Sequence, residues 1–196
     1  MDPVMEKALE QLQDLYKDLD KEIGELQKQS GLHCPPGCGF CCQRPTREIE
    51  ATILEMIPAA LALIEEGQGS FFRDRAQEAG EAGRCVFYSP INEATFSGTC
   101  GRYTFRPLVC RLFGFGAIKN KQGKLEISYS IVMKKTLATV LDSTDKKLTE
   151  GMMAPLYSDY GTRLRGIDSP WTQDSYPLNL ALQKALEWVF LRQRYS

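Results

Sequence analysis

The sequence predicts a mainly α protein, a single α-rich domain with a small β-hairpin element beside a cysteine-rich loop. Apolar residues recur at helical spacing over the first thirty residues and again in the last third of the chain. One short stretch near residue 127 alternates apolar and polar residues as a strand does. The 196 residues suit one domain, within which we expect an N-terminal helix (1–30), a cysteine-cluster region (31–116) and a hairpin with a helical scaffold (117–196).

The composition is that of an ordinary globular protein and excludes several classes. Hydrophobic residues make up 43% and charged residues 25%, so we do not expect a disordered, collagen-like or purely coiled-coil chain. The formal net charge of -1 gives no overall attraction to nucleic acid or to anionic lipid, and neither is expected as a partner. No apolar run reaches membrane-spanning length, and the first residues are too charged for a leader peptide, so a cytoplasmic location is expected.

Residues 1–30 are expected to form one long amphipathic helix. Asp2 and Pro3 supply a capping residue and a first-turn residue, and Gly31 supplies a stop. The apolar stripe is expected to pack on the chain's own core or, alternatively, to form a coiled coil with a second copy or a helix of a protein partner. Its residues follow alternating spacings of 4 and 3: Met5, Leu9, Leu12, Tyr16, Leu19, Ile23 and Leu26.

A loop rich in proline and glycine follows this helix, and two helices follow the loop. The loop is expected at residues 31–44, where its backbone can bend tightly. Apolar residues between 46 and 66 recur at helical spacing, and Pro58 is expected to kink that helix. The breakers at residues 67–70 end it, and a shorter helix is expected to run to about Gly80.

Short extended segments are expected in the middle of the chain. Residues 85–88 and 98–101 look like two such pieces, joined by a loop that contains proline, asparagine and glycine. The alternating residues 125–131 predict one strand of a hairpin whose partner lies near residues 115–118.

Four further helices are expected after the hairpin, at residues 136–141, 145–152, 154–164 and 178–194, with Gly166 as the stop of the third. The last is apolar over much of its surface, so we expect it to be a buried scaffold helix. The residues that give it this character are Leu182, Leu186, Trp188, Phe190 and Leu191.

The seven cysteines are the most informative residues in the chain. An odd number cannot pair completely into disulfides, and in a reducing compartment clustered thiolates bind metal. Four of them lie within nine positions of the loop, where so many thiols have no packing role, and such spacing allows sulfurs to converge to the roughly 2.3 Å that zinc or iron requires. Side chains of adjacent residues diverge, so the last two are not both expected to bind one ion. These four cysteines are Cys34, Cys38, Cys41 and Cys42.

Three cysteines stand apart from the loop, at Cys85, Cys100 and Cys110. Taken singly, each is more often a buried structural thiol than a ligand. Taken together with the loop, all three are predicted to lie near the metal site, which makes all seven cysteines candidate ligands.

Charged and titratable neighbours of the cysteines are also candidates. Arg106 and Arg111 flank Cys110, and their positive charge would offset a thiolate cluster and lower the thiol pKa values. Both arginines are therefore predicted to be cofactor-binding residues. His33, the sole histidine, is expected to be an exposed loop residue, because its side chain and that of the next residue point apart.

Three blocks between residues 34 and 115 resemble the CxxCxxCC, or YkgJ-type, cysteine-cluster family. The blocks are the four-cysteine loop, Cys85 with Phe87 and the later Cys100, and Arg106-Pro107 followed by Cys110-Arg111 and Phe113. The resemblance implies chelation of zinc or iron, and relatives that methylate flagellin lysines carry an iron-sulfur cluster. This chain differs from the family pattern in having three residues rather than two in the first gap.

Two other classes share part of the pattern. The spacing of Cys34, Cys38 and Cys41 copies the radical S-adenosylmethionine signature. That chemistry normally follows the first strand of a β/α barrel, and no alternating series of strands and helices is predicted here. A structural zinc site is the other class, because it needs only four convergent ligands and no redox function.

We therefore expect a thiolate-bound metal centre, with a [4Fe-4S] cluster that supports electron transfer or group transfer as the leading hypothesis. Its expected ligands are Cys34, Cys38 and Cys41, with a fourth from the other four cysteines. The first alternative is a zinc-stabilised interaction module without catalysis, whose N-terminal helix binds a partner. The second is S-adenosylmethionine-dependent methyl transfer, which the resemblance to the flagellin lysine relatives implies.

Overall fold

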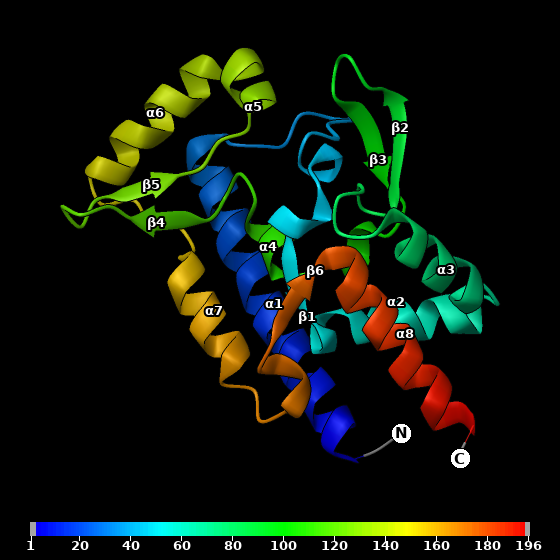
Figure 1. The fold of residues 1–196 in the computed structure, drawn as a ribbon. Coiled ribbons are helices and arrows are strands. Elements are labelled where there is room, and N and C mark those ends of the chain that lie inside the picture. Colours follow the sequence, from blue (N-terminus) through cyan, green and yellow to red (C-terminus); the bar gives the residue numbers. More distant parts are fainter. Residues whose placement is uncertain (1–2, 195–196) are drawn as a thin grey trace.

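The computed structural model describes residues 3–194 and confirms a mainly α fold (Figure 1). The described part holds eight α-helices and three two-stranded antiparallel sheets, without the alternating strands and helices of a β/α barrel. The helices are α1 (Pro3–Ser30), α2 (Ile53–Glu65), α3 (Gly69–Ala79), α4 (Leu108–Leu112), α5 (Ile131–Thr136), α6 (Ala138–Thr149), α7 (Tyr157–Arg165) and α8 (Leu178–Arg194). The strands are β1 (Glu50–Thr52), β2 (Tyr88–Asn92), β3 (Ser97–Cys100), β4 (Ala117–Lys119), β5 (Leu125–Ile127) and β6 (Ser175–Pro177). The sheets pair β1 with β6, β2 with β3, and β4 with β5.

The long helix α1 runs through the middle of the molecule and contacts α2, α6 and α7 (Figure 1). Its apolar stripe therefore packs on the chain's own core, and a coiled coil with a second copy or a partner stays a prediction. Gly31 ends the helix with a positive φ of 77°, and its N–H donates to the carbonyl of Gln27 at 2.8 Å. Asp2, the expected cap, lies outside the described residues. The fully buried residues of the stripe are Met5, Leu12, Leu19 and Leu26.

The helix expected at residues 46–66 begins later than the periodicity predicts. Residues Thr46–Glu48 form a single 3-10 turn, and the next residues form β1. The helix starts after Thr52 because Thr52 and Glu55 form a capping box, in which each side chain accepts a hydrogen bond from the other residue's backbone N–H. Pro58 lies inside α2, where it cannot donate the hydrogen bond that the carbonyl of Leu54 would accept.

The helices expected at residues 136–141 and 145–152 are one helix, α6, and a short helix, α5, precedes it. No breaker separates the two segments, and the Thr144 hydroxyl donates to the carbonyl of Val140 within the helix. The next helix starts at Tyr157 rather than at residue 154. The residues before it are extended instead, and the N–H of Ala117 in β4 donates to the carbonyl of Pro155 at 2.8 Å.

The predicted hairpin is confirmed, with Ala117 paired to Ile127. Its second strand ends at Ile127 because the Ser130 side chain caps α5, which starts directly afterwards. The two extended pieces in the middle of the chain also form a hairpin, β2 and β3, although residues 85–87 form the turn into β2 rather than part of the strand.

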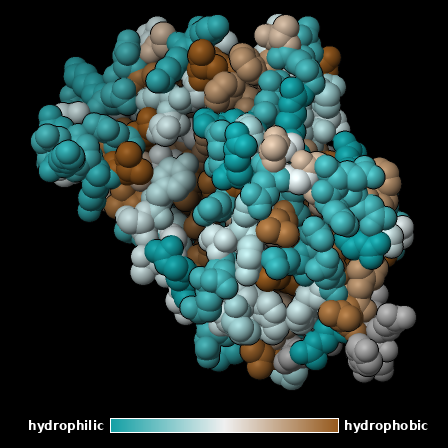
Figure 2. All heavy atoms as spheres, viewed as in Figure 1, coloured by the Kyte–Doolittle hydropathy of each residue, from teal (hydrophilic) through white to brown (hydrophobic). Residues whose placement is uncertain are grey.

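Helix α8 is confirmed as a scaffold element, since it packs against α2 and α3. Leu182 and Leu186 are buried, whereas Leu191 is exposed. No helix among residues 3–194 is long and apolar enough to cross a membrane. On the face drawn in Figure 2 most side chains are hydrophilic, and the apolar ones are scattered among them.

Asn179, in the first turn of α8, fixes the loop that precedes the fifth cysteine. It is buried, and its carbonyl oxygen accepts from the N–H of Val86 at 3.2 Å. Its amide donates to the carbonyls of Gly80 and Arg84 at 3.2 and 3.1 Å. Because Cys85 lies between two of these partners, Asn179 holds its backbone against α8.

Replacing Asn179 by alanine should therefore destabilise the protein. The change leaves the buried N–H of Val86 without its acceptor and removes a donor from the carbonyls of Gly80 and Arg84, which should lower the free energy of unfolding by about 2 kcal/mol. Denaturant unfolding measures this. Gln183→Ala is the matched control, since that amide bonds only to Glu187 on the same helix. Equal stabilities of the two variants would contradict the role given to Asn179.

Candidate metal centre

Five of the seven cysteines line one small cavity of about 30 Å³. This volume holds about one ion or one water molecule. The rest of the wall is almost entirely apolar, apart from the side chains of Arg102 and Arg106. The cysteines of this cavity are Cys41, Cys42, Cys85, Cys100 and Cys110.

These cysteines come from separate segments of the chain. Cys41 and Cys42 lie in the 3-10 turn Cys41–Gln43, and Cys110 lies in the middle of α4. Cys85 precedes β2, and Cys100 is the last residue of β3. The β2–β3 hairpin brings the last two together, because its register pairs Tyr88 with Cys100.

The cysteine loop is attached to the β2–β3 hairpin through its backbone. The N–H of Gly39 donates to the carbonyl of Phe96 at 2.7 Å, and the N–H of Gly98 donates to the carbonyl of Gly37 at 2.8 Å. The loop thus adds a short extended segment to the edge of β3, with Cys38 opposite Ser97. This pairing sets the position of the loop cysteines relative to those of the hairpin.

The ring of Tyr88 explains two glycines of this attachment. A Cβ atom on Gly39 would lie 2.5 Å from Cε2 of Tyr88, and a Cβ atom on Gly98 would clash with the same ring carbon. The Tyr88 hydroxyl accepts from the Gln43 side chain at 2.8 Å and donates to the carbonyl of Ser97 at 3.3 Å. Any larger residue at either glycine would displace this ring.

A buried carboxylate positions the helix that carries Cys110. Glu55 Oε1 accepts from the N–H of Leu108, the first residue of α4, at 2.7 Å, and from the hydroxyl of Tyr16 at 3.0 Å. Burial raises the pKa of Glu55, and these hydrogen bonds partly oppose that rise. With only five residues, α4 depends on such partners outside the helix.

Of the two arginines selected from the sequence, Arg106 lies beside the thiols. It lines the cavity, its guanidinium lies over the ring of Tyr103 at 3.5 Å, and it donates to the carbonyl of Cys110 at 3.3 Å. Arg102, which the sequence analysis did not select, also lines the cavity and forms an ion pair with Glu66. Its place in the same arginine-rich segment as Arg106 is the sequence signal that could have identified it.

Arg111 lies outside the cavity wall. Its guanidinium donates to the carbonyls of Arg106 and Thr104, both at 2.8 Å, and pairs with Asp20 at 2.8 Å. It also lies over the ring of Tyr16 at 4.2 Å. Arg111 therefore holds the segment that contains Arg106 against α1.

Hydrogen bonding divides the thiols of the cavity into two kinds. The Cys42 thiol has one proton to donate, and it lowers the pKa of the neighbour that accepts it, to about 7 for Cys41 or to about 6 for Cys100. Burial raises the pKa of Cys85 to about 12 and that of Cys110 well above its usual value. Near neutral pH, thiolate character therefore concentrates on Cys41 and Cys100.

Backbone amides also face the sulfurs. The backbone N–H groups of Phe87 and Tyr88 lower the pKa of Cys85 against the effect of its burial, and the N–H of Arg102 lowers that of Cys100. Amides directed at sulfur stabilise its negative charge, as they do in thiolate metal sites.

The first two loop cysteines lie outside the cavity wall. Cys34 is exposed and lines a separate open groove of about 510 Å³, which Arg106 also borders. Burial of its sulfur and the nearby Cys38 and Cys41 raise the pKa of Cys34 to about 12. Of the three cysteines expected to be the leading ligands, only Cys41 lines the cavity. His33 is exposed, as expected.

The donor set suits zinc or iron in type, since both accept sites made entirely of thiolates. No group of three or more histidine, cysteine, aspartate or glutamate side chains within residues 3–194 is already arranged to hold a metal ion.

A family comparison agrees with this donor set. The model of the CxxCxxCC family, described as "Putative zinc- or iron-chelating domain", matches residues 33–130, which is half of the chain. The chain belongs to this family. The matched segment contains all seven cysteines and both arginines selected from the sequence, and membership supports metal binding. No curated protein and no solved structure matches the chain.

Replacing Glu55 by alanine should disturb the centre from a distance. The change leaves the N–H of Leu108 and the hydroxyl of Tyr16 buried without an acceptor, which should lower the free energy of unfolding by about 3 kcal/mol. It should also lower the metal content, because α4 carries Cys110. Chemical denaturation and elemental analysis measure both effects.

Glu65→Ala is the control for this variant, since Glu65 lies exposed in the last turn of the same helix. A normal metal content in a folded Glu55→Ala protein would contradict the positioning role.

Proposed function

We propose that the protein binds a [4Fe-4S] cluster through its clustered cysteines and supports redox or group-transfer chemistry. The observation that carries this proposal is the meeting of five thiols from four separate segments at one apolar cavity that two arginines border. A [4Fe-4S] cluster and a structural zinc each take four thiolates, so the bordering positive charge and the apolar wall, rather than the number of thiols, favour the cluster. An apolar wall limits water at a cluster, which adjusts its reduction potential.

The ligands proposed for this cluster are Cys41, Cys85, Cys100 and Cys110. Each comes from a different segment, so their side chains can approach one centre from different directions. Although the side chains of adjacent residues were expected to diverge, the sulfurs of Cys41 and Cys42 lie 3.8 Å apart. Cys42 is left out of the ligand set because it shares a turn with Cys41 and serves as its hydrogen-bond partner.

The surrounding charges suit a centre with net negative charge. Four thiolates around a cluster leave such a charge, and the guanidinium groups of Arg106 and Arg102 border the same cavity. When bound, an iron-sulfur cluster supplies one-electron transfer, or an iron that activates a coordinated group. The protein's own side chains exclude water, hold the thiolates and balance their charge.

A zinc-stabilised interaction module without catalysis is the second candidate. The volume of about 30 Å³ favours it, because this space admits one ion, whereas a four-iron cluster requires the walls to move further apart. In that case the metal contributes folding free energy and no redox chemistry.

Anaerobic purification distinguishes the two candidates. A brown protein with broad absorbance near 400 nm that bleaches with dithionite, and with about four iron and four sulfide per chain, is the expected result. A colourless protein with stoichiometric zinc and no iron would overturn the iron-sulfur proposal and favour the zinc module.

Single alanine variants test which thiols bind. Cys85→Ala and Cys110→Ala should each weaken metal binding by at least about tenfold, since each removes a ligand. Cys34→Ala is the matched control and should retain the metal, because Cys34 lies outside the cavity. Circular dichroism checks that all three variants fold. Loss of metal in the Cys34 variant alone would contradict this ligand set.

Proton release gives an independent test, with zinc as the probe. Without metal at pH 8, Cys85 and Cys110 keep their protons because burial raises both pKa values. Whichever of Cys41 and Cys100 accepts the Cys42 proton is ionised, because its pKa is then about 7 or about 6. Binding to all four should then release about two to three protons, so the apparent affinity should rise at least about 100-fold per pH unit between roughly pH 7.5 and 9. Competition titration with a chelator measures the slope, and a pH-independent affinity would contradict this assignment.

A further inference from the structure

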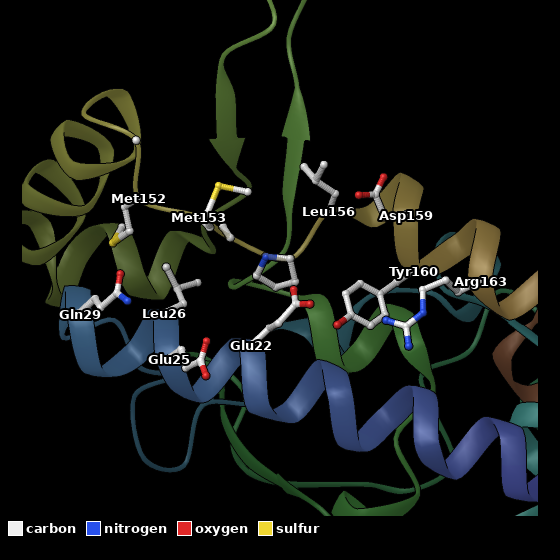
Figure 3. Close-up of a pocket in the computed structure, with 13 residues that line it drawn as sticks. Glu22, Glu25, Leu26, Gln29, Met152, Met153, Leu156, Asp159, Tyr160 and Arg163 are labelled. Atoms are coloured by element: carbon white, nitrogen blue, oxygen red, sulfur yellow. The ribbon is translucent and has the colours of Figure 1, made fainter.

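A second site lies away from the cysteines, in a groove of about 680 Å³ between the C-terminal half of α1, the segment at residues 151–156 and α7 (Figure 3). It shares no lining residue with the cysteine cavity. Its volume falls within the range of small-molecule sites, about 300 to 1,000 Å³.

The groove carries uncompensated negative charge. Glu22 and Glu25 are three residues apart on α1, so they lie on one face of the helix, and Asp159 of α7 also lines the groove. None of these carboxylates has an ion-pair partner among residues 3–194. The one cationic side chain of the lining, Arg163, already pairs with Asp18 at 2.5 Å.

A buried hydroxyl at the same place lacks a partner. Tyr160 is 2% exposed, and within residues 3–194 its hydroxyl is the buried side-chain oxygen or nitrogen without a hydrogen bond. Figure 3 shows this hydroxyl directed towards α1, on which Glu22 and Glu25 lie. Burial and the Glu22 carboxylate raise the pKa of Tyr160, although the two side chains do not form a hydrogen bond of ordinary geometry. A buried polar group without a partner is costly, so this hydroxyl is suited to a ligand that offers one.

The remaining lining is apolar. Leu26, Pro155 and Leu156 form part of the wall, Met152 adds a flexible thioether side chain, and Met153 is 75% exposed beside them. Unbranched thioether side chains adapt to aliphatic chains of different lengths. A fully hydrated metal ion would gain nothing from such a wall, whereas an organic cation uses both the carboxylates and the apolar surface.

We propose that this groove binds an aliphatic amine, an ammonium group carried on a flexible methylene chain. The ammonium lies against Glu22 and Glu25 within reach of the Tyr160 hydroxyl, and the methylenes lie against the apolar wall. Free oligoamines and lysine side chains share this chemistry, and the test separates the two sources.

Calorimetric titration of the full, metal-loaded chain with spermidine tests the proposal. Saturable binding is expected, and the double variant Glu22→Gln/Glu25→Gln should weaken it at least about tenfold. Glu10→Gln, on an exposed position of the same helix, is the control and should leave it unchanged. The metal content should be normal in all proteins, which separates this site from the cysteine centre.

Two further ligands complete this titration. Nα-acetyl-lysine amide binding more tightly than spermidine would assign the site to a peptide side chain, and the reverse order would assign it to a free oligoamine. Magnesium is the second. Displacement of spermidine by equimolar magnesium, or equal affinity in the double variant and in the control, would overturn the proposal.

The variant Tyr160→Phe distinguishes a hydroxyl that binds the ligand from one that only stabilises the fold. Removing a buried hydroxyl without a partner should leave the melting temperature of the ligand-free protein unchanged or raise it, while spermidine affinity falls about three- to tenfold. A lower melting temperature with unchanged affinity would show that the hydroxyl serves the fold and not the ligand.

Discussion

The placement of the cysteine cavity depends on one buried carboxylate, that of Glu55. It accepts hydrogen bonds from the backbone of α4, from Tyr16 of α1 and from Thr52, which caps its own helix. An ionised or polar group with this degree of burial is stable only with such a full set of partners. Three segments that are distant in the sequence therefore have one relative arrangement in which Glu55 is satisfied, and in that arrangement Cys110 faces the other thiols.

The other cysteines are positioned by hydrogen bonds to the backbone of their segments rather than by contacts of their own side chains. The loop is paired with the β2–β3 hairpin, the hairpin register sets Cys100, and Asn179 fixes the turn that holds Cys85. Backbone hydrogen bonds define position more closely than apolar packing does, because they have fixed distance and direction. The scaffold can thus hold the backbone of each segment while the sulfurs retain the freedom to move onto a metal.

Local patterns in the sequence predicted much of the fold. The apolar stripe of α1 and its end at Gly31 could be predicted because helical spacing and capping are local properties of the sequence. The helix expected from residue 46 begins only at residue 53. Ile49 fits the helical spacing, but the residues that follow it pair with β6, far along the chain. Pairing with a distant strand has no local signature, so only the Thr52 capping box could have shown the true start.

The sequence predicted which residues belong to the candidate site, but not which of them line the cavity and which lie outside it. Cysteine spacing identified the residues that meet, because clustered thiols on a loop have few other uses. The spacing did not separate Cys34 and Cys38 from the five cysteines that line the cavity. The sequence also placed Arg111 beside the metal, whereas the guanidinium of Arg111 pairs with Asp20 of α1. These distinctions depend on contacts between distant segments, which the order of residues alone does not contain.

The extended segment around Cys38 also has a protective consequence. By lying along β3, it covers a strand edge that would otherwise present unpaired N–H and C=O groups. Exposed edges of this kind invite pairing with other chains. The pairing of Cys38 with Ser97 therefore also protects the hairpin from association with other chains, apart from its part in placing the thiols.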